Sequence, residues 1–517
     1  MEKRLYTVAV DLGTTNVVVI VGWKNDDGTI HVDKLVSRPC EGLSAGEIEN
    51  IASAGNSIRA ALSEVEVSLG FRVSEVYAGI SGRFIRCDSY TDHVFTADSQ
   101  SGVSSQDVEA LYERMAGVKA SDDEIILESI PQNFMVDDRR EVKNPVGSFG
   151  KRLSSTFKFI LCEPTPLDRL QRVFAGLNIK LLGIYPTMLT IVDSIVTPDE
   201  REEGVAIVDL GGGKTDVTVV YKNIIRYVAS IPMGGQTINS DIYSLGVPEK
   251  YVERLKVKHG SAVAEMTERK LLQIPGGRSR DVKGLLSYNL AAAIEGRMMD
   301  IIELVKGELR ESGFGDKLSY GIVLAGGGSR LANVAELFRR ETGMDVRLSE
   351  TDSINKNKPD MPPYATALGV LMRGLADGKS TLLSSQQHQQ PRPETQHVEP
   401  ERPMRTASVQ PAATAPVQPE TGTAAKPAPA APSASDAPAS KPEPAPQQPM
   451  SPYGLRTRIH GQTIEEAEAE AVVDDEAAER RKATEERRGG FLKSIFGKMQ
   501  NFVDQSFENG GDEDTNF

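Results

Sequence analysis

The sequence predicts an α/β protein made of two similar halves. Two stretches share one pattern, VAVDLGTTNVVVIVG from residue 8 and VAIVDLGGGKTDVTVVY from residue 205. In each, a β-branched run is followed by Asp-Leu-Gly, two small residues and a second apolar run, which is typical of two strands joined by a tight turn. A third stretch, LSYGIVLAGGGSRLANVAELFRRETG from residue 318, is an apolar strand, a Gly-rich turn and an amphipathic helix.

The length of 517 residues indicates more than one folding unit. Residues 1 to 378 have ordinary globular composition, with apolar runs spaced by turn residues. From about residue 380 the chain becomes rich in Gln, Pro, Ala, Thr and Ser, as in KPAPAAPSASDAPASKPEPAPQQPM. Such a segment has too few apolar side chains to offset its ordering entropy, so we expect a disordered, extended linker there.

Charge and cysteine content exclude several classes of protein. The net charge of -14 and the lack of a concentrated basic segment argue against a nucleic-acid binder. Cys40, Cys87 and Cys162 are far apart, without disulfide or metal-ligand spacing, and are expected to be small buried apolar residues. We see no secretory signal and no apolar stretch of ~20 residues, and therefore expect a cytosolic globular part.

The first repeated turn has the residues of an anion site. Gly13 allows close backbone approach, and the next three residues place hydroxyl, amide and backbone N–H donors around one point. These donors belong to Thr14, Thr15 and Asn16. Asp11 would repel a phosphate there unless a divalent cation lay between them, so we interpret it as a Mg²⁺ ligand, through water or directly.

The second turn repeats this arrangement around Asp209. Its candidate phosphate-binding residues are Gly211, Gly212, Gly213, Lys214 and Thr215. Two such hairpins facing each other would enclose a polyphosphate from both sides, with both aspartates near one metal. A single hairpin of this kind is equally well an ordinary β-turn, but two copies at the starts of two halves favour a binding site.

Further candidate ligand-binding residues follow the second turn. The Gly-rich turn offers backbone N–H groups at a helix N-terminus and no side chain to obstruct a flat ligand. Glu253 and Lys256 are three residues apart and share one helical face; without the surrounding motifs, a solvated ion pair would be the favoured explanation. The candidates outside the two hairpins are Gly234, Gly235, Glu253, Lys256, Gly326, Gly327, Gly328, Ser329 and Arg330.

In this order the motifs resemble those of the actin, Hsp70 and sugar-kinase superfamily of ATP-binding proteins. Within it, the chain resembles the FtsA family of bacterial cell-division proteins. The segments IPQNFMVDDRREVKNPVGSFGKRL, VKHGSAV and LAGGGSRL carry this resemblance, which covers about residues 5–375 and the extreme C-terminus.

The resemblance implies an α/β, actin-like two-lobed ATPase fold with duplicated RNase H-like lobes and ATP-Mg²⁺ in the cleft. It implies a first lobe (1A) over 1–85 and 164–200, with an FtsA-type extra subdomain (1C) over 86–163. It further implies a second lobe core (2A) over 201–231 and 310–378, and a subdomain 2B over 232–309. The linker then covers residues 379–460. It is followed by a charged stretch over 461–488 and by a membrane-targeting amphipathic helix over 489–509.

The same resemblance implies a function. The protein would polymerise with ATP-Mg²⁺ and tether the tubulin-like protein FtsZ to the cytoplasmic membrane at the division septum, where it would recruit later division proteins. By this resemblance, the FtsZ-binding surface lies in about Ile231–Leu309. Partners would thus be FtsZ, further copies of the chain, later division proteins and anionic lipids.

Rapid ATP hydrolysis is not expected. Relatives of this fold usually place Glu or Gln near the end of the first lobe to orient the attacking water, whereas Tyr185 precedes Pro186 here. Tyr is a poor base near neutral pH, because its ordinary pKa is about 10. In addition, Asn16 and Lys214 stand where the family often has Lys and Thr, which suggests that the positive charge has moved to the other hairpin.

The end of the chain predicts an interfacial membrane helix. Advancing about 100° per residue places the apolar residues within about 160° of arc. They are Phe491, Leu492, Ile495, Phe496, Met499, Phe502, Val503 and Phe507. Lys493 and Lys498 lie on the polar side, and Arg487 and Arg488 just precede the helix, as suits anionic lipid. The alternatives are packing on the chain's own globular part and docking into a partner's groove.

Three other functions remain to be compared with this one. A sugar or metabolite kinase would need a carboxylate that deprotonates a substrate hydroxyl, and it gives no reason for the amphipathic tail. An Hsp70-type chaperone would need a β-rich peptide-binding domain after the lobes, where this chain has a Pro/Ala-rich linker. The rod-shape actin MreB lacks the FtsA-type segment before residue 165 and carries its anchor at the N-terminus.

Overall fold

We describe residues 6–25, 28–97, 102–138, 140–275, 282–350 and 362–378 of a computed structural model. The predicted linker (379–460), charged stretch (461–488) and amphipathic helix (489–509) lie outside these residues. Among the described helices, none combines the length and the apolar character that crossing a membrane requires.

The sheet of the first lobe has five strands in the order β11–β6–β1–β2–β3. Strand β2 pairs antiparallel with β1 and with β3, whereas β6 pairs parallel with β1 and with β11. The strands are β1 (Thr7–Leu12), β2 (Asn16–Lys24), β3 (Ile30–Pro39), β6 (Glu75–Ile80) and β11 (Lys180–Pro186). The lobe also contains β4 (Leu43–Ser44), β5 (Glu47–Ile48), α1 (Ile51–Leu69), α3 (Pro164–Gly176) and α4 (Thr187–Ile195).

The sheet of the second lobe repeats this topology in the order β18–β17–β12–β13–β14, with the same strand directions. Its strands are β12 (Val205–Leu210), β13 (Thr215–Tyr221), β14 (Ile224–Ile231), β17 (Ile322–Ala325) and β18 (Val346–Leu348). Around it lie α5 (Pro198–Glu203), η1 (Gly315–Lys317), η2 (Gly327–Arg330) and α9 (Val334–Thr342). The duplication predicted from the repeated sequence element is therefore confirmed.

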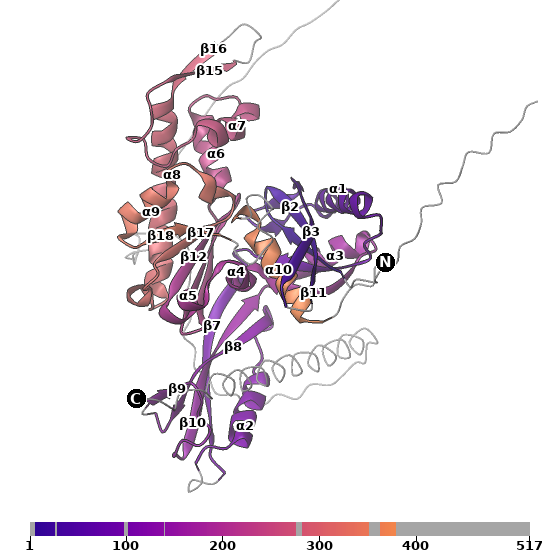
Figure 1. Cartoon of the computed structure of the whole chain (residues 1–517), viewed down its shortest axis with the longest axis vertical. Helices are drawn as coiled ribbons and strands as arrows, with labels where there is room; N and C mark the ends of the chain where they lie inside the picture. Colours follow the sequence, from indigo (N-terminus) through magenta and orange to yellow (C-terminus); the bar gives the residue numbers. More distant parts are fainter. Residues whose placement is uncertain are drawn as a thin grey trace, which may run out of the picture. The chain divides into compact units, whose positions relative to one another are not determined.

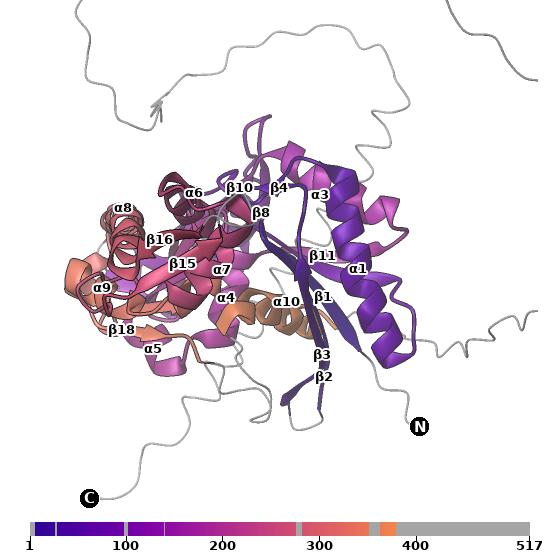
Figure 2. The same ribbon diagram turned by 90° about the horizontal axis from the view of Figure 1, so that it is seen from above.

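Both faces of the first sheet are covered, which explains its continuous β-branched runs. Val8 and Val10 belong to the core that includes Ile58 of α1. Ala9, between them, faces the opposite core, which includes Leu368 of α10 (Ala365–Ala376). Figure 2 shows α1 and α10 on opposite sides of the sheet.

A separate antiparallel sheet is inserted between β6 and α3, in the order β7–β10–β8–β9. It consists of β7 (Ile85–Phe95), β8 (Ile125–Val136), β9 (Arg140–Val142) and β10 (Arg152–Cys162), with α2 (Ser105–Ala116) against it. Figure 1 shows α2 beside these strands. Leu111 and Met115 of α2 pack with Phe157 in a core of their own.

Another group of elements follows β14 in the chain. It comprises α6 (Gly235–Ser244), α7 (Glu249–His259), β15 (Leu271–Pro275), β16 (Val282–Leu286) and α8 (Ser287–Glu311). Figure 1 shows them gathered at the end of the second lobe beyond its sheet. Val252 of α7 and Ile294 of α8 share the core of Val208 and Val217, so this group is continuous with the second lobe.

Helix α10 corrects one predicted boundary. Residues 310–378 are predicted to belong to the second lobe, but α10 packs on the first sheet, after η3 (Pro362–Tyr364). Its buried residues Ala367, Leu368, Val370 and Leu371 form one core with Ala9 and Tyr77. Sequence order could not show this, because the chain returns to the first lobe after completing the second sheet.

The cysteines are less uniformly buried than expected. Cys162 is fully buried, whereas Cys40 and Cys87 are half-buried. Burial raises the pKa of the Cys40 thiol to about 11 and that of the Cys162 thiol to about 12. The protonated thiols behave as small apolar groups, as the sequence predicts.

Candidate functional site

The two Asp-Leu-Gly turns have the same backbone geometry. The Gly13 amide donates to the Asn16 carbonyl at 3.0 Å, and the Gly211 amide donates to the Lys214 carbonyl at 2.9 Å. The tips of the turns are Thr14, Thr15, Gly212 and Gly213. Within the described residues the amides of these four residues donate to no acceptor, so they can bind an anion.

The tips of the two turns contact each other. A Cβ atom on Gly213 would lie 2.6 Å from the Thr14 hydroxyl oxygen, and one on Gly212 would overlap the Thr15 side chain. Small residues in the second turn are therefore needed for the lobes to approach this closely. The prediction that the two hairpins face each other across the lobes is confirmed.

Asp11 and Asp209 occupy matching positions in β1 and β12. Burial raises the pKa of Asp11, and it raises the pKa of Asp209 to about 7. The Thr366 hydroxyl donates to Asp11 at 2.5 Å, and Gly326 packs so tightly on Asp209 that a Cβ atom there would overlap the carboxylate. A nearby cation would compensate this burial of two carboxylates.

The donor set fits Mg²⁺ only when a ligand supplies further oxygens. Across the described ranges, no three His, Cys, Asp or Glu side chains gather at one point. Mg²⁺ commonly binds one or two carboxylates together with phosphate oxygens and water, and Asp11 and Asp209 match that requirement.

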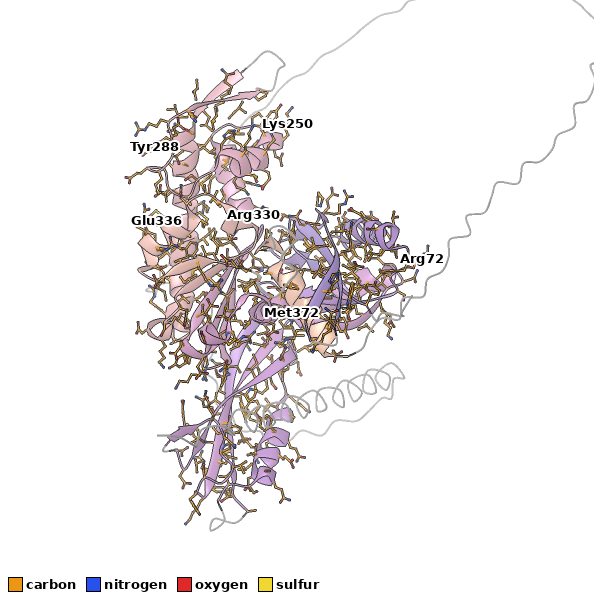
Figure 3. All side chains as sticks on the ribbon, in the orientation of Figure 1. Arg72, Lys250, Tyr288, Arg330, Glu336 and Met372 are labelled. Atoms are coloured by element: carbon orange, nitrogen blue, oxygen red, sulfur yellow. The ribbon has the colours of Figure 1, made fainter. Side chains whose placement is uncertain are left out.

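The two turns and the Gly-rich turn after β17 open onto one cavity of about 750 Å³. This volume lies within the usual range for small-molecule and cofactor sites. The predicted residues that line it are Asp11, Gly13, Thr14, Thr15, Asn16, Asp209, Gly211, Gly212, Lys214, Gly234, Gly235, Glu253, Lys256, Gly326, Gly327, Gly328 and Arg330. Figure 3 shows Arg330 on the side of the second lobe that faces the first.

Glu253 and Lys256 lie on α7 at the cavity wall, as their spacing predicts. They form an ion pair at 2.8 Å, and the Lys256 ammonium also donates to the Gly235 carbonyl at 3.0 Å. Asn239 donates to Glu253 at 2.7 Å. Lys256 is therefore fixed against the glycine pair, more firmly than a solvated surface ion pair would be.

Three predicted residues do not line the cavity. Gly213 supports Thr14, as described above. The Thr215 hydroxyl is buried and donates to the Met233 carbonyl at 2.8 Å, and the buried Ser329 hydroxyl donates to the Gly326 carbonyl at 2.7 Å. These three residues therefore help to hold the turns in place and do not face a ligand in the cavity.

The cavity also has polar residues that the sequence did not reveal. They are Ser37, Ser81, Thr187, Lys258, Tyr364 and Thr366. Thr366 reaches Asp11 across 355 residues of chain, so no local pattern could have indicated it. Asp216 does not line the cavity but forms an ion pair with Lys214, and it has no acidic counterpart in the first copy of the repeated element.

Lys214 does not stand free at the second turn. It forms an ion pair with Asp216, and it donates to the Ser81 hydroxyl at 2.9 Å. Burial alone would lower the pKa of Lys214, but the charges of Asp216 and Asp209 outweigh burial and raise this pKa. The lysine is therefore positively charged at neutral pH.

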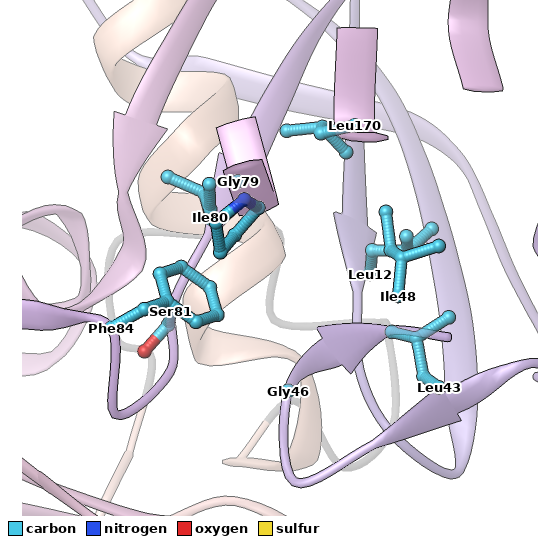
Figure 4. Close-up of a pocket in the computed structure, with 10 residues that line it drawn as sticks. Leu12, Leu43, Gly46, Ile48, Gly79, Ile80, Ser81, Phe84 and Leu170 are labelled. Atoms are coloured by element: carbon cyan, nitrogen blue, oxygen red, sulfur yellow. The ribbon is translucent and has the colours of Figure 1, made fainter. Parts of the chain in front are cut away.

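Apolar side chains support the first turn from behind. Figure 4 shows Leu12, Ile48, Phe84 and Leu170 around a gap of about 10 Å³, which has room for no more than about one water. The Ser81 hydroxyl lies at the edge of this gap and donates to Asp216 at 2.6 Å. This apolar packing holds Ser81 and the end of β1 in fixed positions.

Tyr185 lies away from the cavity. Its ring stacks on Tyr77 with centroids 5.8 Å apart, and burial raises its pKa above the ordinary value. Its side chain is not part of the cavity lining. The cavity residue nearest to it in the sequence is Thr187, which has no carboxylate to orient a water.

Comparison with known proteins identifies the family. The family model "Cell division protein FtsA" matches residues 206–369, and the model "SHS2 domain inserted in FTSA" matches residues 85–161. FtsA of Pseudomonas aeruginosa is 31% identical over 394 residues, which cover 75% of this chain and 94% of that protein. FtsA of Escherichia coli K12 is 29% identical over 382 residues, covering 72% and 90%.

Solved structures support the same fold. The PilM-PilN type IV pilus biogenesis complex contains a chain with a TM-score of 0.51 at 14% identity, covering 71% of this chain and 98% of that one. The fold is α/β and actin-like, with an inserted SHS2 domain. From the match over nearly the full length of its relatives, this chain belongs to the FtsA family of cell division proteins.

Proposed function

We propose that the chain binds ATP-Mg²⁺ in the cavity between its lobes. The observation that carries this proposal is the pair of facing turns, whose tip residues Thr14, Thr15 and Gly212 line one cavity together with the two buried aspartates. A polyphosphate with a divalent cation satisfies both the amides and the carboxylates. A neutral ligand would leave two buried carboxylates uncompensated.

The residues divide into three roles in this proposal. Asp11 and Asp209 hold Mg²⁺ through water, and the cation neutralises phosphate charge. The turn amides and Lys214 bind phosphate oxygens. Glu253 and Lys256, together with the Gly-rich turn that ends at Arg330, hold the nucleoside.

Isothermal titration of the full chain with ATP tests this proposal. Asp209→Asn keeps the size of the side chain but removes its charge, so we expect at least about a tenfold loss of affinity in Mg²⁺ and a much smaller effect in EDTA. Asp199→Asn, on the exposed start of α5, is the matched control. Equal affinities of the wild type and Asp209→Asn in Mg²⁺ would contradict the metal assignment.

We propose that nucleotide acts mainly as a structural clamp and polymerisation switch, with slow turnover. The support is Tyr185, which stands where the family resemblance implies a water-orienting side chain and whose ring packs on Tyr77 outside the cavity lining. Steady-state phosphate release should therefore be slow. Rapid release that Asp209→Ala abolishes would contradict this proposal.

We further propose that the protein forms filaments and tethers FtsZ to the cytoplasmic face of the membrane at the division septum, where it recruits later division proteins. Membership of the FtsA family supports this proposal. The FtsZ-binding surface is proposed in the group from α6 to α8, residues 231–309. The membrane contact is proposed in residues 489–509, through anionic lipids.

The proposed division of the chain follows the sheets. The first lobe comprises 1–85, 164–197 and, from the packing of α10, residues 365–376. The inserted subdomain comprises 86–163, the second lobe core 198–231 (from the start of α5) and 310–364, and its outer subdomain 232–309. Separate expression of residues 86–163 tests the boundaries of the inserted subdomain. Because this subdomain has its own hydrophobic core, the isolated fragment should unfold in a cooperative transition.

A further inference from the structure

A lysine crosses from the second lobe into the first beneath the facing turns. Lys214 ends the second turn, and its aliphatic stem passes the β4–β5 turn of the first lobe. A Cβ atom on Gly46 would lie 3.0 Å from Lys214 Cδ and 3.2 Å from Cε. The ammonium then donates to Ser81, which directly follows β6 in the first lobe.

Asp216 completes this link from the second lobe. Its side chain is 4% exposed, and it accepts hydrogen bonds from Lys214, from Ser81 at 2.6 Å and from Ser230 at 2.7 Å. A buried carboxylate with a cation and two hydroxyl donors is fully satisfied. Lys214, Asp216 and Ser81, which we call the cross-lobe cluster, therefore join the two lobes through the hydrogen bonds between Ser81 and the Lys214–Asp216 ion pair of the second lobe.

The cluster is also part of the cavity wall. Lys214 and Ser81 both line the cavity. The Gly46 amide donates to the Thr14 hydroxyl at 3.0 Å, so the turn that accommodates the lysine stem also supports the first phosphate-binding turn. An anion bound at the turn tips would thus contact the Lys214 ammonium, which lies at the end of the cavity formed by first-lobe residues.

Lys214 has hydrogen-bonding capacity left for such an anion. An ammonium group has three N–H donors, and within the described residues two of them go to Ser81 and Asp216. The third can be donated to a phosphate oxygen while the link between the lobes remains intact.

The arrangement of the other ligand-binding groups indicates which phosphate this is. Lys256, Glu253 and Arg330 line the second-lobe side of the cavity, whereas the Lys214 ammonium lies against Ser81 of the first lobe. A nucleotide that holds its nucleoside at the second lobe extends its phosphates toward the turns. Its last phosphate therefore comes closest to Lys214.

We propose that Lys214 distinguishes nucleoside triphosphate from diphosphate, by donating to the terminal phosphate from the cross-lobe cluster. This inference rests on the proposed nucleotide binding. It assigns Ser81 and Asp216 as positioning residues, which hold the lysine in place without touching the ligand. The terminal phosphate of a triphosphate then binds Lys214, the same side chain that contacts the first lobe, whereas a diphosphate does not reach it.

Isothermal titration of the full chain with ATP-Mg²⁺ and with ADP-Mg²⁺ tests this proposal. Lys214→Met should lower ATP affinity by about tenfold or more and ADP affinity by less than about threefold. Lys214→Arg keeps the charge and should retain most of the ATP preference. Lys222→Met, at the exposed turn position directly after β13, is the matched control and should change neither affinity.

A double variant separates phosphate recognition from a purely structural role. Lys214→Met alone leaves Asp216 buried without its cation and can destabilise the fold. Lys214→Met/Asp216→Asn removes both charges, so the fold should recover while the ATP preference stays lost. Recovery of the ATP preference in the double variant would overturn the proposal.

The proposal and the function on which it rests fail in different ways. If the wild type binds ATP and ADP but Lys214→Met lowers both affinities equally, the proposal about the terminal phosphate is wrong and nucleotide binding stands. If the wild type binds neither nucleotide, the proposed function itself is wrong, and this inference falls with it.

Discussion

Gly326 is a cavity position at which the backbone conformation and the available space allow only glycine. It has a φ of 78°, and a Cβ atom there would overlap the Asp209 carboxylate and lie 2.7 Å from the Leu210 carbonyl oxygen. Only glycine adopts this backbone conformation without strain. Its neighbour Gly327 has nothing within 4 Å of the equivalent position.

Gly326→Ala should therefore destabilise the protein by about 1–3 kcal/mol from backbone strain alone, and weaken ATP binding through displacement of Asp209. Gly327→Ala should leave the stability nearly unchanged. Thermal unfolding of both variants beside the wild type measures this difference. Equal unfolding midpoints for the two variants would contradict the geometry at Gly326.

The ion pair of Glu200 and Arg347 predicts a pH dependence of stability. Glu200 accepts two hydrogen bonds from Arg347, at 2.5 and 2.7 Å, and one from the Thr197 amide at 2.8 Å. Burial by itself would raise the pKa of Glu200, but these hydrogen bonds outweigh it and hold the pKa below its ordinary value. The carboxylate thus stabilises the fold above the unfolded-state pKa, and this stabilisation is lost as the pH falls through the folded-state pKa.

Arg347→Met should cost about 1–3 kcal/mol near pH 7, where Glu200 is charged and loses its partner. The difference from the wild type should narrow as the pH falls below about 4.5, because the carboxyl then becomes protonated in both proteins. Urea unfolding at several pH values measures this difference. A difference that is constant across this pH range would show that the pair contributes through packing and not through charge.

At this scale the sequence predicted the residues that belong to local motifs. Asp11, Asp209 and the turn glycines are recognisable because the chain repeats them at one spacing. Ser81 and Thr366 were not predictable, because each becomes part of the site only when distant segments meet. Thr215 and Ser329 were overpredicted, because a turn needs hydroxyl groups for its own hydrogen bonds as well as for a ligand.

Helix α10 connects several parts of the fold. Thr366, in its first turn, binds Asp11 at the cavity. Two turns later, Arg373 donates to Asp193 of α4 at 2.6 Å and to Glu128 of the inserted sheet at 3.3 Å. The same helix thus contacts the candidate metal site, α4 and the inserted subdomain.

Arg373→Met should lower stability by up to about 3 kcal/mol, because two largely buried carboxylates lose a shared cation. Asp193 keeps Arg201 at 3.0 Å. Hydrogen exchange should increase both in β8 and in α4, since each loses its contact with Arg373. Arg172→Met, on an exposed position of α3, is the control; equal exchange in the two variants would contradict this role.

At the scale of elements, the sequence predicted the duplication but not where every element packs. The repeated strand pair implied two related sheets, and both have the same strand order. The position of α10 was not predictable, since its apolar residues would suit either sheet. The extra subdomain was expected from the family resemblance, which residues 130–153 within it partly carry, whereas the order of its strands was not predicted.

For the whole molecule, the proposed function joins nucleotide binding to membrane attachment. The amphipathic helix predicted at 489–509 would bind a membrane reversibly on its own. Filaments would present many such helices together, and the effective affinity would rise by ~10² or more. Membrane binding should therefore depend on both the tail and the nucleotide-dependent assembly of the lobes.

Co-sedimentation with anionic liposomes in the presence of ATP-Mg²⁺ tests this account most directly. The experiment compares the full chain, a chain that ends at Arg488, Phe496→Glu on the predicted apolar face and Gln500→Glu on the polar face. We expect the full chain and Gln500→Glu to pellet, and the truncated chain and Phe496→Glu to stay in solution. A full chain that does not pellet, or a truncated chain that pellets equally, would contradict the proposed membrane tether.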